Sequence, residues 1–427
     1  MMKSWVRDLD VRERKTMFAC FAGWALDAMD VQIYSFVIPT LLVVWHLTKA
    51  QAGLIGTAAL VVSALGGVIS GALCDRFGRV RVLQFTIVFY AVFTGLCGFA
   101  QNFQQLIVLR ACEGFGFGGE WAAGSVLICE VIRDKFRGRA GGIVQGGWAV
   151  GWGCAAIIYT IVFSIVPEAM AWRVMFWIGL LPALLVVYLR RHIQEPEIFQ
   201  KKVETRKEPV GAHFLTLFKP PYLFTTVLVS LMITGAQGAT YILNIWVPTY
   251  LRVERGMSVV NTGGIMFITI AGAWIGYTLG GYSADYLGRK ATLLIFGILS
   301  VVMVCAYTML PLTKNQLLPV GFVMGIIAYG IFSPMGPYLS EMFPTKIRGT
   351  GQGFCYSFGR GIGAFFPALI GIYSMKWRLG IAIPLFFGIA TAIMIAALIM
   401  LPETKGRKLA TAFGEETGEQ AQAATHR

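Results

Sequence analysis

The sequence contains little charge for its length. Asp, Glu, Lys and Arg make up 14% of its 427 residues, whereas soluble domains carry about 25%. Hydrophobic residues make up 56%, and the mean hydropathy is +0.67. Because charged side chains keep a soluble surface hydrated, this deficit indicates that much of the chain does not meet water.

Motifs for metal sites, disulfides and catalysis are also missing. The eight cysteines contain no Cys-x-x-Cys pair, so neither a disulfide framework nor a zinc site is indicated. The four histidines lie near loops or tails and lack metal-ligand spacing. The sequence has no Gly-x-x-x-x-Gly-Lys-Ser/Thr, no His-Glu-x-x-His and no Gly-x-Ser-x-Gly. It therefore predicts no enzyme, no cofactor, no metal and no use of ATP.

Long apolar runs are what the sequence does contain. A membrane-spanning helix needs about 20 apolar residues, and we expect an all-α membrane protein of twelve transmembrane helices. The expected spans are 17–43, 52–74, 82–101, 105–129, 140–165, 170–190, 222–250, 259–283, 291–311, 316–339, 350–373 and 379–401. They predict a six-helix bundle at 1–190, a cytoplasmic linker at 191–220, a second six-helix bundle at 221–402 and a cytoplasmic tail at 403–427.

The net charge of +14 would fit a nucleic-acid partner if the basic residues formed a patch. Instead they alternate between loops. With the N-terminus in the cytoplasm, the loops on that side hold about 27 of the 36 lysines and arginines, and the opposite loops hold about 7. This asymmetry is the topology signal of a membrane protein. We expect a bacterial inner-membrane protein that acts as a monomer, with both termini in the cytoplasm and no nucleic-acid partner.

Two loop motifs occur twice at nearly the same offset. Gly71-x-x-x-Asp75-Arg76-x-Gly78-Arg79 follows the second span, and Gly281-x-x-x-Asp285-x-x-Gly288-Arg289 follows the eighth. Glu130 precedes Arg137-Gly138 by the same spacing that separates Glu341 from Arg348-Gly349. The offsets are about 210 residues in both pairs, so the chain consists of two parallel repeats of six spans. Repeats of this kind are typical of secondary transporters, whose site lies at the membrane midplane between the halves.

These residues resemble the major facilitator superfamily over essentially the whole chain. The Gly-x-x-x-Asp-Arg-x-Gly-Arg loop is similar to that superfamily's loop between spans two and three. Arg110-Ala-Cys-Glu113-Gly-Phe-Gly116 and Pro402-Glu403-Thr404-Lys405-Gly406 are similar to its sugar-porter-like branches. The resemblance implies two pseudo-symmetric six-helix bundles and transport by alternating access.

Two stretches favour the organic-acid branches of that superfamily. Asp27-Ala-Met-Asp30 resembles the paired aspartates in the first span of proton-coupled carriers of organic acids. Gly118-Gly119-Glu120-Trp121 resembles the fourth span of sialate and monocarboxylate proton symporters; aromatic-acid symporters and nicotinate carriers match that stretch less well. The antiporter motif Gly-x-x-x-Gly-Pro is absent, because Trp152 follows Gly151. Its absence disfavours drug efflux.

Asp27 and Asp30 are the first candidate site residues. An Asp at mid-membrane costs roughly 2.5–3.5 kcal/mol on insertion scales, and residues at i and i+3 share a helix face. We therefore expect both carboxyl groups to face a polar cavity, where burial and a like charge nearby favour proton uptake. Glu120 of the fourth span is a further proton candidate. The alternative for the pair is a structural hydrogen bond or ion pair.

Buried arginines are the candidate anchors for an anion. Arg360 is the deepest full charge in the second half, and an Arg facing a cavity suits a carboxylate. Arg110 could pair with Glu113, with an Asp of the first span or with substrate, and Arg360 could instead be a packing or gating residue. The neutral candidates for the same cavity are Gln32, Tyr34, Gln145, Gln237, Tyr241 and Asn244.

The charged loop residues predict a cytoplasmic gate. They lie at span ends, where ion pairs could hold that side shut in an outward-open state. The predicted gate residues are Asp75, Arg76, Arg79, Glu130, Arg137, Asp285, Arg289, Glu341 and Arg348.

Together these features predict a secondary active transporter. Its substrate is a small organic acid anion, namely a sialate, a monocarboxylate or an aromatic carboxylate, taken up together with protons. The alternatives are an uncoupled facilitator or exporter of a small metabolite, or a transporter-like receptor. The buried carboxylates disfavour uncoupled transport, and the short linker and tail disfavour a receptor.

Overall fold

A computed structural model of the chain describes residues 7–405, except 133, 185, 187–213 and 345–346. Within helices, the side chains of residues 71–72, 74–76, 79, 121–126, 129–130, 134–139, 141–142 and 349 also lie outside the description. The predicted linker therefore falls mostly outside the described residues, and so does the tail beyond residue 405.

The described chain is helical throughout and contains no strand. The helices of the first half are α2 (Val11–Val44), α3 (Lys49–Phe77), α4 (Arg79–Cys97), α5 (Phe103–Val131), α6 (Asp134–Ile165) and α7 (Glu168–Ile178). Those of the second half are η1 (Leu215–Phe218), α10 (Tyr222–Thr249), η2 (Tyr250–Glu254), α11 (Val259–Leu287), α12 (Arg289–Met309), α13 (Lys314–Gly330), α14 (Phe332–Met342), α15 (Arg348–Gly363), α16 (Phe365–Tyr373) and α17 (Leu379–Met400).

The helices correspond to the expected spans. Ten helical stretches of the described residues are long and apolar enough to cross a membrane. The expected span 105–129 lies within α5 and carries three full charges. The span 170–190 begins within α7 and continues into residues outside the description. In the second half, α13 with α14 and α15 with α16 each form one span. The prediction of an all-α protein with many membrane-spanning helices is confirmed.

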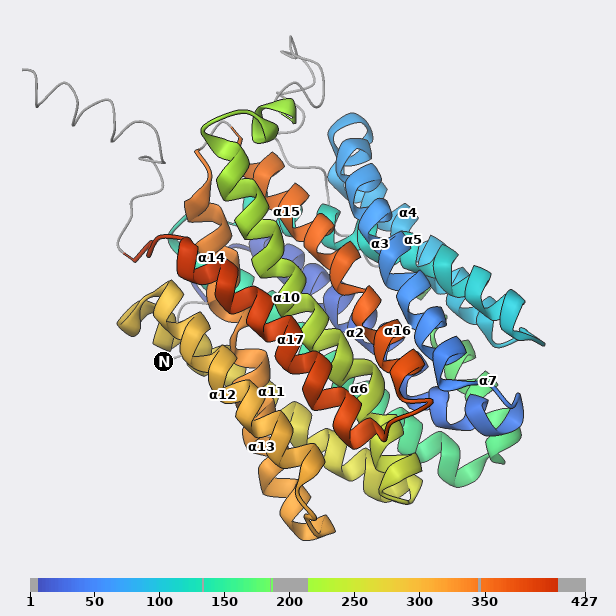
Figure 1. Ribbon diagram of the computed structural model, residues 1–427. Helices are drawn as coiled ribbons and strands as arrows, with labels where there is room; N and C mark the ends of the chain where they lie inside the picture. The colour runs from blue at the N-terminus through green and yellow to red at the C-terminus, as the bar shows by residue number, and fades with distance from the viewer. Residues whose placement is uncertain (1–6, 133, 185, 187–213, 345–346, 406–427) are drawn as a thin grey trace, which may run out of the picture.

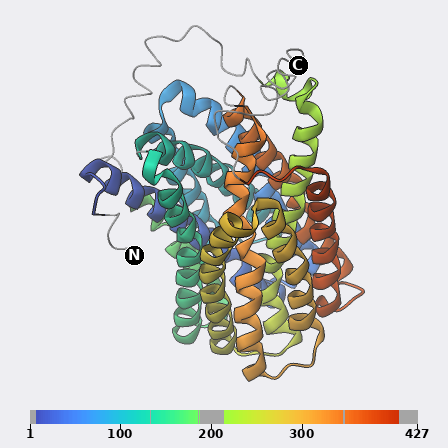
Figure 2. The same ribbon diagram turned by 90° about the vertical axis from the view of Figure 1, so that its left-hand side faces the viewer.

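Helices α2, α3 and α6 of the first half pack against helices of the second half. Figure 1 shows α3 beside α15 and α16, and Figure 2 shows α6 beside α11. Between these two pairs, α2 packs against α10. The first helix of each half therefore lies at the middle of the seam, where side chains of α2 and α10 can face the same space.

Polar contacts between the halves lie toward the end where α2 leads into α3. There the Lys49 ammonium donates to the Ser374 carbonyl at 3.4 Å, and Arg252 pairs with Glu168 at 2.9 Å. Further along α3 from Lys49, the Thr57 hydroxyl donates to the Ala364 carbonyl at 2.7 Å. These three contacts each join a helix of the first half to a helix or loop of the second.

Helix α5 reaches the centre of the first half because glycines remove the side chains between it and α3. A Cβ on Gly118 would stand 1.7 Å from the Ser63 carbonyl oxygen, and one on Gly114 would stand 2.0 Å from that of Ala59. Small residues of this kind let transmembrane helices approach backbone to backbone. The charged face of α5 is held in place by this contact.

Gly118→Ala is accordingly expected to force α5 away from α3. We expect a loss of stability of about 1–3 kcal/mol, as for other overpacked interiors, seen as a lower melting temperature of the purified protein. Gly264→Ala is the matched control, because no atom lies within 4 Å of a Cβ at that position. Equal melting temperatures for the two variants would contradict the close approach.

Candidate functional site

Asp27 and Asp30 lie on the inner face of α2. The helix begins with a capping box in which Asp10 accepts from the Glu13 N–H at 2.7 Å and its own N–H donates to Glu13 at 3.0 Å. Both aspartates are 1% exposed, and none of their four carboxylate oxygens has a hydrogen-bond partner in the described structure. An ionised carboxylate buried in this way is costly unless it is paired. The two groups are therefore suited to holding protons.

Asp27 lies beside a second acid. Its carboxyl group is next to that of Glu120 on α5 and next to the Tyr90 hydroxyl on α4. Two carboxylates are both acceptors, so they can hydrogen-bond to each other only when one carries a proton. The three side chains can therefore hold at least one proton between them in the interior of the first half.

Asp30 lies one turn further along α2 in a different group. Its neighbours are Arg110 and Glu113 of α5 and Thr94 of α4. Gly179, which follows α7, leaves room for it, because a Cβ there would stand 3.0 Å from Oδ1 of Asp30. Asp30 and Glu113 thus share the single positive charge of Arg110.

The charged residues of α5 form one face of that helix. Arg110 and Glu113 form a buried ion pair at 2.5 Å, with exposures of 3% and 1%. Phe117 and Glu120 follow at spacings of four and three residues, which keeps all four side chains on the same side. Glu120 at one end of this face lies beside Asp27 of α2, and Arg110 and Glu113 at the other end lie beside Asp30 and border the seam between the halves.

A small cavity lies in the seam where α5 meets α10. Arg110, Glu113 and Phe117 line it from the first half, and Tyr241 and Asn244 line it from the second. Its volume is about 20 Å³, room for about one water molecule. The predicted residue Tyr34 also borders it, with the Arg110 guanidinium 4.9 Å from the centre of its ring. The structure thus has an almost closed site at the middle of the seam.

Arg360 lies beside this cavity and is 4% exposed. Its Nε donates to the Tyr241 hydroxyl at 3.1 Å, and its guanidinium lies 4.4 Å from the centre of the Phe117 ring, across the seam. No described carboxylate lies within ion-pair distance of it. A buried cation without an acidic partner has the charge that an anionic substrate requires.

The neutral residues predicted for the cavity divide into two groups. Tyr34, Tyr241 and Asn244 line it. Gln32 is fully buried and accepts a hydrogen bond from Ser35 at 3.0 Å on its own helix, Gln237 is packed near Gly363, and Gln145 is half-buried on α6. None of these last three lines the cavity in this structure.

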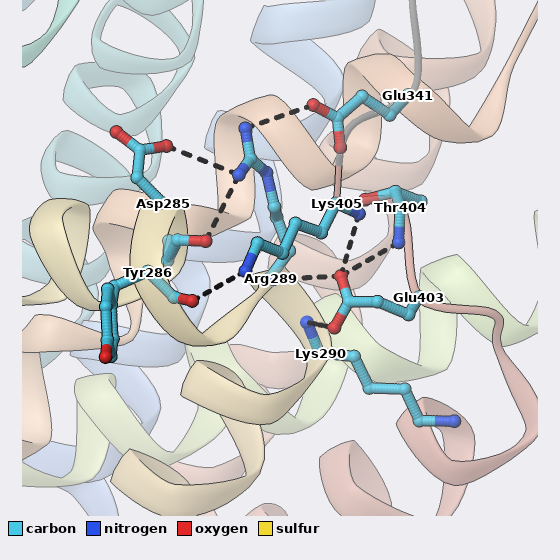
Figure 3. A network of polar contacts seen from close by, with 9 residues as sticks. Asp285, Tyr286, Arg289, Lys290, Glu341, Glu403, Thr404 and Lys405 are labelled. Atoms are coloured by element: carbon cyan, nitrogen blue, oxygen red, sulfur yellow. Dashed lines mark hydrogen bonds and ion pairs between the residues drawn. The ribbon is translucent and has the colours of Figure 1, made fainter.

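The predicted gate residues that can be placed lie within the second half. Arg289 is 3.3 Å from Asp285 of α11 and 3.5 Å from Glu341 of α14 (Figure 3). Arg348 donates to the Ser340 carbonyl at 2.8 Å. These contacts join helices of one half rather than crossing the seam. The side chains of Asp75, Arg76, Arg79, Glu130 and Arg137 lie outside the described residues, so a gate between the halves stays a prediction.

Glu403 supplies the cap that the start of α12 lacks. Its carboxylate accepts from the backbone N–H groups of Arg289 at 2.9 Å and Lys290 at 3.0 Å, and from those of Thr404 and Lys405 (Figure 3). Gly288, at φ 107°, has no side chain that would block this approach. Partial burial acts to raise the pKa of Glu403, but these N–H donors together hold that pKa below its ordinary value.

Glu403→Gln is expected to lower stability by about 0.5–2 kcal/mol, the range for loss of a helix cap. A carboxylate with a depressed pKa stabilises the fold above its ordinary pKa, and this contribution is lost as the pH falls through the lower folded value. The difference in melting temperature should therefore shrink in acid, below about pH 4. Asp285→Asn is the control, because that side chain is 80% exposed. A deficit independent of pH would contradict the cap.

Two residues of the site were not predicted from the sequence. Tyr90 lies in an apolar run of the third span, and Phe117 in one of the fourth, where neutral aromatic residues are usually packing residues. For Phe117 a signal existed, because its spacing from Glu113 and Glu120 places it on the charged face of α5.

Known proteins share both the sequence pattern and the fold. The profile of the Major Facilitator Superfamily matches residues 20–367 and 279–423. A protein of Cupriavidus pinatubonensis named "Probable 4-methylmuconolactone transporter" is 38% identical over 95% of this chain and 94% of its own. The sialic acid transporter NanX of Escherichia coli is 29% identical over 94% of this chain and 96% of its own.

The crystal structure of a D-xylose-proton symporter superposes with a TM-score of 0.74, covering 92% of this chain and 99% of the symporter. Its sequence identity is 17%, so this likeness concerns the fold alone. The predictions of a transporter rather than an enzyme, and of a multi-pass membrane protein, are confirmed. The family profile matches most of this chain, and two transporters align with it nearly end to end, so the chain belongs to the major facilitator superfamily.

Proposed function

We propose that this protein takes up a small organic acid anion together with protons, by alternating access of its two halves. The observation that carries the proposal is Arg360, a buried cation at the seam that contacts both halves and has no acidic partner among the described residues. A carboxylate would supply the missing charge. Both named relatives are transporters, and one of them carries sialic acid by name.

Proton coupling is supported by the acids of the first half. Asp27, Asp30 and Glu120 are buried, and both oxygens of each aspartate lack a hydrogen-bond donor in the described structure. Protons taken up here would neutralise groups that are costly to bury as anions. Because Asp30 and Glu113 share Arg110, protonation of one of them changes the charge that the cavity presents to a substrate.

The proposed orientation places both termini in the cytoplasm of a bacterial inner membrane, on the basis of the Lys and Arg distribution. The end at which Lys49 contacts Ser374 and Arg252 contacts Glu168 is then the periplasmic end. In this state the path from the periplasm would be closed by contacts between the halves. Breaking them would open the site outward.

Transport by the purified protein in liposomes tests the proposal. A thermal-shift screen with benzoate, nicotinate, lactate and N-acetylneuraminate first identifies a carboxylate that binds. Uptake of that compound is then measured with and without an imposed gradient, acidic outside. We expect accumulation only with the gradient. Equal uptake in both conditions, levelling at the external concentration, would indicate an uncoupled facilitator instead.

A further inference from the structure

Asn244 lines the cavity and is held by a partner that does not. It lies on α10 and is 2% exposed. Its Oδ1 accepts a hydrogen bond at 2.6 Å from the hydroxyl of Tyr329 on α13. Tyr329 is 1% exposed and is not one of the residues that line the cavity. The hydrogen bond therefore reaches Asn244 from behind, out of the interior of the second half.

This hydrogen bond fixes which end of the Asn244 amide faces the cavity. The oxygen and the nitrogen of an amide differ little in size, but the oxygen only accepts hydrogen bonds and the nitrogen only donates them. Because Oδ1 is bonded to Tyr329, Nδ2 is the end left for the cavity, and it donates to no described residue. A carboxylate oxygen of a substrate would find a donor there.

Tyr241 presents a second donor on the same face of α10, three residues before Asn244. Its hydroxyl accepts from Nε of Arg360 at 3.1 Å, and no described residue accepts the proton of that hydroxyl. The terminal amino groups of Arg360 are also without a hydrogen-bond partner in the described part of the chain. The second half thus offers donors to the cavity from a hydroxyl, an amide and a guanidinium.

The opposite wall of the cavity offers groups of both kinds. Nε and Nη1 of Arg110 donate no hydrogen bond to a described residue, and Oε2 of Glu113 accepts none. An anion would therefore meet a carboxylate as well as a guanidinium on the first half, but donors on the second. We expect its oxygens to face α10 and Arg360.

A ring of the first half holds Tyr329 in turn. Trp152 of α6 is 1% exposed and packs against the Tyr329 ring across the seam, with 5.2 Å between centroids. The Tyr329 ring is thus packed against one half while its hydroxyl bonds to a cavity residue of the other. Tyr329→Phe would keep the ring contact and remove only the hydroxyl.

From these contacts we propose that Tyr329 is a positioning residue of the substrate site. Its hydroxyl holds the Asn244 amide with the nitrogen toward the cavity, where that nitrogen donates to a carboxylate oxygen of the substrate. The inference rests on the proposed function and adds to it a residue that does not touch the substrate. Without the hydroxyl the amide can turn, and its oxygen would then repel an anion. Tyr329 therefore acts on affinity through Asn244.

A double-mutant cycle tests this dependence. The probe is whichever of benzoate, nicotinate, lactate and N-acetylneuraminate binds the wild-type protein most tightly, and dissociation constants are measured on the purified protein in nanodiscs. Tyr329→Phe should weaken binding roughly 2- to 12-fold, the equivalent of about 0.5–1.5 kcal/mol for one hydrogen bond. Asn244→Ala should weaken it at least as much. Added to Asn244→Ala, Tyr329→Phe should have no further effect, because the amide it orients is gone.

Tyr307→Phe is the matched control. Tyr307 is also a fully buried tyrosine of the second half, but it packs against Tyr250, with 6.4 Å between centroids, and does not line the cavity. Its variant should bind the probe as the wild type does. The melting temperature without ligand is measured for every variant, so that a loss of folded protein is distinguished from a loss of affinity.

Asn244→Asp tests the direction of the amide. Asp has the shape of Asn but carries an oxygen in place of Nδ2, and it can still accept from the Tyr329 hydroxyl. The variant therefore places an acceptor where the wild type has a donor. We expect a larger loss of affinity than in Asn244→Ala. An affinity equal to that of Asn244→Ala, or higher, would contradict an amide nitrogen directed at the substrate.

The outcomes separate this inference from the proposed function. If a carboxylate binds and Tyr329→Phe either leaves its affinity unchanged or weakens it equally with and without Asn244→Ala, Tyr329 does not act through the amide, while the carrier of organic acids stands. If no carboxylate binds to the wild-type protein, both proposals fail.

Discussion

Arg360→Ala is expected to abolish measurable binding of small carboxylates while leaving the fold intact. Removing one partner of a buried charge pair typically costs 2–5 kcal/mol or more of binding free energy, so affinity should fall by at least about 30-fold. The fold should tolerate the change, because Arg360 has no acidic partner among the described residues. Ligand-dependent thermal shift of the purified variant, compared with its unliganded melting temperature, measures both quantities.

Arg360→Lys is the companion variant. It keeps the positive charge but loses the planar fork and the stacking on Phe117. An intermediate affinity would show that charge and geometry both contribute. Wild-type affinity in Arg360→Ala would place the anion elsewhere, with Arg110 the next candidate, because it lines the same cavity.

The second large effect is expected from the double variant Asp27→Asn, Asp30→Asn. Each coupled proton supplies about 1.4 kcal/mol per pH unit, a tenfold concentration ratio. The wild-type protein should therefore accumulate substrate in proteoliposomes under a pH gradient. The double variant should lose this accumulation, so that its internal concentration only equals the external one. Exchange of labelled for unlabelled substrate should persist, because amides preserve the shape of the site.

Asp8→Asn is the control for this experiment, since it removes an exposed carboxylate that precedes α2 and is not among the lining residues of the cavity. It should accumulate substrate as the wild type does. The single variants should show which aspartate dominates. Asp27 shares its surroundings with Glu120 and Tyr90, whereas Asp30 shares Arg110 with Glu113. Full gradient-driven accumulation by the double variant would contradict the assignment of these residues.

Charges in apolar runs made much of the site predictable. Asp27, Asp30 and Arg360 stand out because full charges are costly in a membrane, and each is buried near the seam or the centre of the first half. The repeated loop motifs likewise predicted two parallel halves. The pairing of Asp27 with Glu120 was not predictable, because it depends on how closely the glycines of α5 bring that helix toward its neighbours.

Neutral residues and partners were harder to predict than charges. Phe117 and Tyr90 look like ordinary packing residues in an apolar run, and only the register of α5 distinguishes Phe117. Gln32 and Gln237 share spans with cavity residues but face other parts of the structure. Glu403 was recognised as part of a family motif, but its role as the cap of α12 depends on a contact between residues more than 100 positions apart.

Substrate-driven proton movement is the most direct test of the account. Proteoliposomes holding a pH-sensitive dye, with equal pH inside and outside, receive the carboxylate that binds best. The account predicts acidification of the interior on addition of substrate to the wild-type protein, and none with the Asp27→Asn, Asp30→Asn variant. Uptake of substrate by the wild-type protein without any change in internal pH would contradict proton coupling.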